Sequence, residues 1–145
     1  MSWPAPQPGL VIRYSYLWRR EAQAGQEDGV KDRPCAVVVA FLEEDGRTRV
    51  YALPITHTPP APDEDAIEIP AEVKARLRLD GERSWVLLTE ANTFNWPGPD
   101  LRFLPGKGPE SAAYGFLPPG LFRVIRERFI AASRAKKAAL VARTA

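Results

Sequence analysis

Apolar positions in the first third of the chain recur with the periods of β-strands. In residues 10–18, "LVIRYSYLW", alternate positions are apolar or aromatic, whereas residues 34–42, "PCAVVVAFL", form one uninterrupted apolar run. A β-branched run without alternation is typical of a strand buried on both faces. The segment "EEDGRT" that follows contains Asp45-Gly46, a favoured hairpin pair. We therefore predict a hairpin that returns through residues 49–56, in which Pro54 marks the strand end or a bulge.

Shorter elements follow the hairpin. The segments "IEIP" and "SWVLLTEA", residues 67–70 and 84–91, indicate strands, and residues 71–79 indicate two turns of amphipathic helix. Pro and Gly dominate residues 97–120, which predicts turns around a short strand "LRFL". Apolar side chains at helical spacing in residues 121–140 predict a C-terminal helix.

Together these elements predict a mainly β fold with a C-terminal helix. Residues 1–145 are long enough for one ordinary domain and too short for two. Short strands joined by turns suggest a small, strongly bent β-barrel with long loops in residues 1–118, followed by a helix in residues 119–141. Residues 19–32 are polar without a period, so we expect an exposed, mobile loop there.

Composition narrows the chemistry that the chain can support. Cys35 is the only cysteine and His57 the only histidine, which excludes an internal disulfide, a multi-thiolate metal site and a His-rich metal cluster. We expect neither a metal nor another cofactor. No apolar run approaches the ~18 residues needed to cross a bilayer, and the first ten residues lack the features of a secretory signal. A cytoplasmic protein with no membrane partner is therefore expected.

The charge is divided unevenly along the chain. Residues 119–145 contain seven Lys or Arg and one Glu, whereas residues 1–118 contain thirteen Lys or Arg against seventeen Asp or Glu. A weakly acidic body with a basic tail permits an anionic partner. A solvated helix face is the alternative reading of that tail.

Polar residues stand at the ends of three predicted apolar strands. They belong to "DRP" at residues 32–34, "PITHT" at residues 54–58 and "TEAN" at residues 89–92. In an antiparallel hairpin, the start of one strand lies beside the end of its partner. We therefore expect Arg33 to lie near Thr56 and His57.

These three residue types suit cleavage of RNA by its own 2′-OH group. Arg33 offers a planar fork of donors to phosphate oxygens, Thr56 offers a hydroxyl group, and His57 can exchange a proton near neutral pH. Trp18 borders a predicted loop, where an aromatic ring can stack on a base. Structural readings remain open: Arg33 could pair with Asp32 or Glu90, Thr56 could simply end a strand, and His57 could be a solvated loop residue.

The chain resembles the MazF/PemK family of bacterial growth-inhibitor toxins across most of residues 9–132. The likeness rests on "PGLVIRYSYL", on the Arg-Pro that opens "RPCAVVV" after a Gly-containing loop, on "YALPITHT", which is similar to the family's Val-Pro-x-Thr-Thr segment, and on "WVLLTEAN". The resemblance implies a small SH3-like barrel of the CcdB/PemK type. It also implies a homodimer with a cognate antitoxin protein as its partner.

The resemblance implies an activity as well: metal-independent, sequence-specific cleavage of single-stranded RNA. Arg33 matches the family's catalytic arginine and Thr56 its active-site threonine, while His57 takes a position that is often threonine or serine. Glu90 lies near an acid found in some members. The acid of the family's loop corresponds to Glu27 or Asp28. We expect Glu90, both of these loop acids and Trp18 to contact substrate.

Two other functions fit the same resemblance. The first is an inactive barrel that binds RNA or a protein without cutting. The second is a toxin that traps a protein target, as the gyrase-poisoning relatives of this barrel do.

Overall fold

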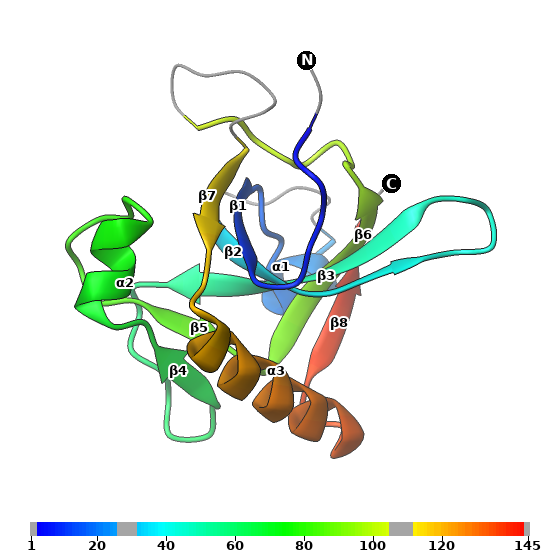
Figure 1. Ribbon diagram of the computed structural model, residues 1–145. Coiled ribbons are helices and arrows are strands. Elements are labelled where there is room, and N and C mark those ends of the chain that lie inside the picture. Colours follow the sequence, from blue (N-terminus) through cyan, green and yellow to red (C-terminus); the bar gives the residue numbers. More distant parts are fainter. Residues whose placement is uncertain (1–2, 26–31, 105–111, 144–145) are drawn as a thin grey trace.

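The computed structural model describes residues 3–25, 32–104 and 112–143, and it has one mainly antiparallel sheet and a long C-terminal helix. The sheet runs in the order β4–β5–β3–β2–β1–β7, and β6 pairs with both β3 and β8 (Figure 1). The β6–β8 pair is parallel and the other pairs are antiparallel. The strands are β1 Leu10–Tyr14, β2 Arg33–Leu42, β3 Thr48–Thr56, β4 Ala66–Glu68, β5 Trp85–Leu87, β6 Glu90–Trp96, β7 Ala113–Phe116 and β8 Ala139–Ala142, and the helices are α1 Arg19–Gln23, α2 Ala71–Arg76 and α3 Pro119–Arg134.

The predicted hairpin is formed by β2 and β3, with Gly46 in its turn at φ 86°. Near the turn Val39 pairs with Tyr51, but farther along Val37 pairs with Ala52, so β2 contains one extra residue at this point. Such a β-bulge changes the phase of the strand relative to its partner. The register beyond the bulge, extended by two residues from the pair Cys35–Pro54, places Arg33 across from Thr56.

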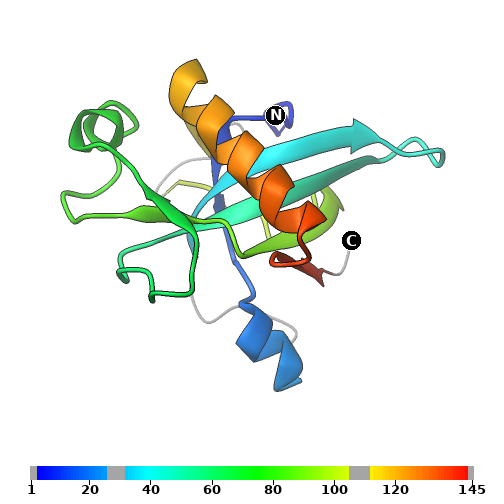
Figure 2. The same ribbon diagram turned by 90° about the horizontal axis from the view of Figure 1, so that it is seen from below.

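The apolar run of β2 is buried on both faces, as its sequence predicts. Ala36 and Val38 belong to one hydrophobic cluster, whereas Cys35 and Val37 belong to a second cluster on the other side. Alternation of side chains along a strand explains this division. α3 lies across the first of these faces (Figure 2).

α3 is shorter than the helix predicted over residues 119–141. It begins at Pro119, a favourable residue for a first helical turn, and buries Ile125 and Phe129 against the sheet. It ends at Arg134, because Lys136 has a φ of 57° and the N–H groups of Lys136 and Lys137 donate to carbonyls of the last turn. A helix end of this kind usually has glycine at the position of Lys136, so the sequence did not reveal it. The predicted helix is therefore wrong beyond Arg134. No helix in the described ranges is long and apolar enough to cross a membrane.

Pairing also creates elements in segments whose local pattern is weak. α1 lies within the loop predicted for residues 19–32, and residues 84–91 are divided between β5 and β6. β6 extends beyond residue 91, where the predicted strand ended, and β7 lies within residues 97–120, where turns were expected. The "LRFL" segment contributes only a single bridge from Leu101 to Tyr14. β6 is paired along β3 and β7 along β1. Tertiary pairing thus overrides a weak local preference.

Pro54 lies inside β3 and does not end it. On the side opposite β2, residues Thr48–Ala52 of β3 pair with β6 and residues Ile55–Thr56 pair with β5. Pro54 falls between these two partners, where the strand changes neighbour. Proline supplies no ladder donor, and a place where a strand changes partner is one where such a residue is tolerated.

Candidate functional site

A cavity of about 610 Å³ lies where β2 begins and β3 ends, at the end of the hairpin away from its turn. Arg33, Thr56, His57 and Trp18 all line it. The structure therefore brings together four of the residues that the sequence singles out. Glu90 is not among the lining residues. Glu27 and Asp28 lie outside the described residues.

Arg33 is half-buried at the rim of this cavity. Its guanidinium carbon lies 4.8 Å from the ring centroid of Trp18, and burial lowers the pKa of the guanidinium, although arginine stays charged at any ordinary pH. Its Nε is buried and has no hydrogen-bond acceptor among the described residues. Asp32 pairs instead with Arg13 at 3.6 Å and Arg102 at 3.5 Å. Within the described part of the chain, Arg33 is thus held by an aromatic ring and not by an acid.

Trp18 holds two guanidinium groups at once. The guanidinium carbon of Arg20 lies 5.2 Å from the Trp18 centroid, and the ring of Tyr16 meets Trp18 edge-on at 5.2 Å. A cation over an indole face is attracted by the ring quadrupole. Trp18 therefore supports the cationic side of the cavity, in addition to any contact with a base.

Thr56 closes β3 and starts the loop beside the cavity. Its Oγ1 accepts a hydrogen bond of 3.1 Å from the N–H of Thr58, a local turn that Thr side chains often form. Because this bond uses only the acceptor side, the hydroxyl hydrogen is available to donate. Thr56 can therefore offer a donor to a phosphate oxygen.

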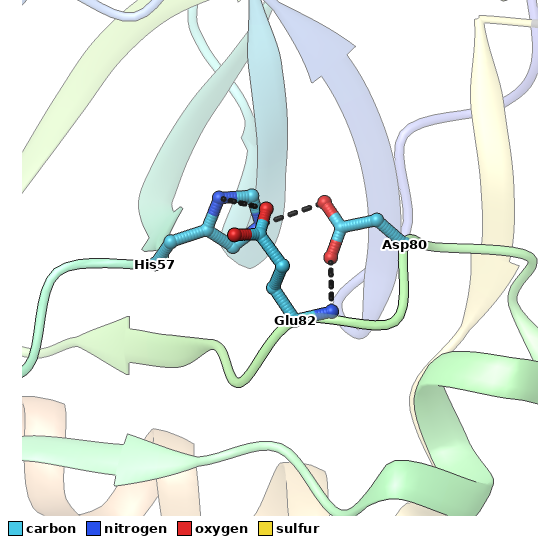
Figure 3. Close-up of side chains that lie close together, drawn as sticks. All are labelled: His57, Asp80 and Glu82. Carbon is cyan, nitrogen blue, oxygen red and sulfur yellow. Dashed lines mark hydrogen bonds and ion pairs between the residues drawn. The ribbon is translucent and has the colours of Figure 1, made fainter.

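His57 is exposed, yet it has two acidic neighbours. Its Nε2 lies 2.6 Å from Asp80 Oδ2 and its Nδ1 lies 3.3 Å from Glu82 Oε2 (Figure 3). Both acids come from the loop between α2 and β5. His57 is therefore an exposed loop residue, as the structural interpretation expects, but it lies against two acids.

The cluster of His57, Asp80 and Glu82 offers ligand types that metal ions use. One ligand atom from each residue lies within 4.8 Å of the others, and all three residues are exposed. However, the two acids contact different nitrogens of one ring, and the ammonium group of Lys74 lies 2.7 Å from Asp80 Oδ1. A cation thus already neutralises Asp80, so the arrangement fits an ion-pair network better than a metal site.

Asp80 is ionised by its surroundings. Partial burial acts to raise its pKa, but the hydrogen bonds from Lys74 and from the N–H of Glu82 outweigh burial and lower the pKa below its usual value. A group of this kind adds stability above the pKa of the unfolded chain and loses it as pH falls through the folded-state pKa.

Sequence reasoning missed Asp80 and Lys74. Asp80 lies twenty-three positions after His57 in the chain and across a helix from it, so no local pattern joins the two. Lys74 did give a signal: it is next to Val73 and three residues before Leu77, on the apolar side of α2. A lysine on a buried helix face indicates a paired ammonium group.

Glu90 lies behind the cavity and contacts it through Tyr16. Its Oε1 accepts hydrogen bonds from Tyr16 Oη at 3.1 Å and from the N–H of Arg19 at 3.0 Å. Burial raises the pKa of Glu90, and the hydrogen bonds only partly offset this. Burial likewise raises the pKa of Tyr16. Glu90 therefore positions the segment around Tyr16 and Arg19 and does not face the cavity.

The raised pKa of Glu90 predicts a pH-dependent effect of Glu90→Gln. The folded chain holds this proton more tightly than the unfolded chain does, so wild-type stability falls as pH rises from the unfolded pKa through the folded one. Glutamine keeps an acceptor for Tyr16 but has no such dependence. The free energy of unfolding of the variant relative to wild type should therefore increase between about pH 4 and about pH 7. Urea titrations at both pH values check this, with exposed Glu44→Gln as the control; a relative stability that falls with pH contradicts the assignment.

No protein-family model, curated protein or solved structure matches this chain. The likeness to the MazF/PemK family rests on the sequence segments quoted above.

Proposed function

We propose that this protein is a metal-independent endoribonuclease that cleaves single-stranded RNA through attack of the 2′-OH group. The observation that supports it most is the convergence of Arg33, Thr56 and His57 on the wall of one cavity. A guanidinium, a hydroxyl donor and an imidazole are the groups that this reaction needs. The resemblance to MazF/PemK toxins adds the expectation of sequence-specific cutting, a homodimer and an antitoxin partner.

The reaction assigns a role to each group. His57 takes the proton from the 2′-OH, whose oxygen attacks the adjacent phosphorus. The bond from phosphorus to the 5′-oxygen breaks, and the proton is returned to that oxygen. The products are a 2′,3′-cyclic phosphate and a 5′-OH end. Arg33 stabilises the negative charge that develops on the phosphorane, and Thr56 donates to one of its oxygens.

We extend the proposal to the fold type, an SH3-like barrel. Two features support it: β3 pairs with two different strands, β6 and β5, along one side, and α3 covers one face of the sheet. These features are shared with other small bent sheets, so the likeness of the quoted segments supplies the rest.

The direct test incubates purified protein with a long mixed-sequence RNA in EDTA and maps the ends of the products. We expect discrete cuts that leave 2′,3′-cyclic phosphates. A second RNA with a single 2′-deoxy nucleotide at the mapped position should resist cleavage there, because the nucleophile is missing. Absence of product in EDTA, or cutting at the deoxy position, contradicts the proposed function.

Arg33→Ala should lower the cleavage rate by about 10²–10³-fold, the usual loss when one preorganised donor to a developing anion is removed. Arg33→Lys should recover only part of the rate, because lysine keeps the charge without the planar fork. Arg83→Ala is the matched control, since Arg83 also lies over an indole ring, 5.0 Å from the centroid of Trp85, but does not line the cavity. A similar rate in Arg33→Ala and Arg83→Ala would remove Arg33 from the reaction.

A binding protein that does not cut is the second candidate. The observation in its favour is that both nitrogens of His57 lie near carboxylates, which compete with a substrate for the imidazole. Such a protein binds RNA with a strong salt dependence and yields no product in the same assay.

A further inference from the structure

The ammonium group of Lys74 is buried beside the cavity, where a charge is unfavourable unless it is paired. Lys74 is 5% exposed. Its Nζ lies 2.7 Å from Asp80 Oδ1 and donates to Ser84 Oγ at 2.6 Å and to the carbonyl of Glu82. All three donors of the ammonium group are thus engaged by the loop between α2 and β5.

The end of α2 explains how the chain reaches this arrangement. Arg78 has a φ of 58°, and the N–H of Leu79 donates 2.9 Å to the carbonyl of Lys74. This closure reverses the chain directly after the helix. The following residues then pass over the side chain of Lys74 and bring Asp80 to its ammonium group.

The contacts leave Asp80 with one oxygen for His57. Oδ1 accepts hydrogen bonds from Lys74 Nζ and from the N–H of Glu82 at 3.1 Å. Oδ2 lies 2.6 Å from His57 Nε2 (Figure 3). The carboxylate is therefore fixed on one side and presented to the imidazole on the other.

We propose that Asp80, held in place by Lys74, is the positioning residue of His57. The proposal rests on the proposed function for its catalytic consequence. Asp80 fixes the ring and engages Nε2, which leaves Nδ1 to exchange the proton with substrate. The only described acid near Nδ1 is Glu82, at 3.3 Å, and its side chain is 73% exposed, so it can move aside when RNA binds. An oriented imidazole with an acid behind it is a common arrangement for general bases.

The competing interpretation is structural: Lys74 and Asp80 could simply anchor the loop. Under that interpretation, a change at Asp80 alters the stability of the protein. It leaves the Nε2 signal of His57 unchanged and does not lower kcat selectively over KM. The two interpretations therefore differ in measurements made on His57 itself.

The first experiment observes His57 by NMR in protein labelled with ¹⁵N-histidine. Since the chain has one histidine, each ring nitrogen gives one signal. We expect the Nε2 proton of the wild type to be protected from exchange with water and to give an observable resonance. Asp80→Asn should lose that protection, and Asp63→Asn, which removes a charge from an exposed residue that does not line the cavity, should keep it. Identical Nε2 signals in wild type and Asp80→Asn would overturn the proposal.

The second experiment measures RNA cleavage by the same proteins. Asp80→Asn should lower kcat on the order of 10²-fold, with KM within about twofold, because orientation of the base acts on the chemical step. Lys74→Met should lower kcat in the same direction, and Lys74→Arg should restore part of it. Thermal melts confirm that each variant is folded. An unchanged kcat in folded Asp80→Asn overturns the proposal.

The two experiments separate the inference from the function on which it rests. If wild-type protein cuts no RNA, the proposed function fails, and the NMR comparison still decides whether Asp80 positions His57. If the wild type cuts RNA and Asp80→Asn cuts it equally well, the proposed function stands and the inference fails.

Discussion

His57→Ala should lower the rate of RNA cleavage by roughly 10²–10⁴-fold, the usual contribution of a general base or acid. The side chain is 45% exposed and follows the end of β3. Its removal therefore creates no cavity in either hydrophobic cluster, and the melting temperature should stay close to that of the wild type. Single-turnover cleavage of a mapped RNA site checks the rate.

Free imidazole provides a sharper control for this variant. If the missing group acts as a proton carrier, added imidazole should restore part of the activity of His57→Ala. The same addition should leave Arg83→Ala unchanged, because Arg83 lies outside the cavity. A rate for His57→Ala close to wild type would exclude the imidazole from the mechanism.

Arg143→Met should lower the free energy of unfolding by about 3–5 kcal/mol, since it removes a buried guanidinium that is paired with a buried carboxylate. The Arg143 side chain is 1% exposed, and its Nη2 lies 2.9 Å from Asp100 Oδ1, itself nearly buried. Its Nη1 donates to the carbonyl of Ser15 at 2.6 Å and to Asn92 Oδ1 at 3.1 Å. One guanidinium thus connects the residue after β8 with β6, with the segment after β1 and with the loop at Asp100.

The measurement is a urea titration of Arg143→Met against wild type. Arg134→Met is the matched control, because Arg134 ends α3 and is exposed, and its effect should stay within about 0.5 kcal/mol. The slope of the transition should be unchanged in both variants if the compactness of the unfolded chain is unaffected. A loss below about 1 kcal/mol for Arg143→Met would show that the buried network is not a major source of stability.

The sequence predicted the part of the site that depends on local pairing. A hairpin with a tight turn determines which strand ends meet, so Arg33 and Thr56 could be placed together from chain order alone. The apolar run of β2 also predicted burial on both faces, which the two hydrophobic clusters confirm.

The rest depends on contacts between distant segments. The end of α3 uses Lys136 where glycine is usual, and β8 then pairs in parallel with β6, so neither the helix end nor the strand had a local signal. Asp80 likewise reaches His57 only because Lys74 is buried and the chain turns back after α2. A sequence pattern does not show that residues so far apart in the chain lie close together in the fold.

The single extra residue in β2 near Val38 determines on which face of the sheet the side chains at the open end of the hairpin lie. Without it, every residue of β2 from Arg33 to Val37 would be turned over relative to the tip of the hairpin. The guanidinium would then project into the layer opposite the cavity, although no residue of the cavity itself had changed. The orientation of Arg33 therefore depends on the number of residues that β2 contains at Val38, five positions away. For this reason, a deletion at Val38 is not equivalent to a substitution there.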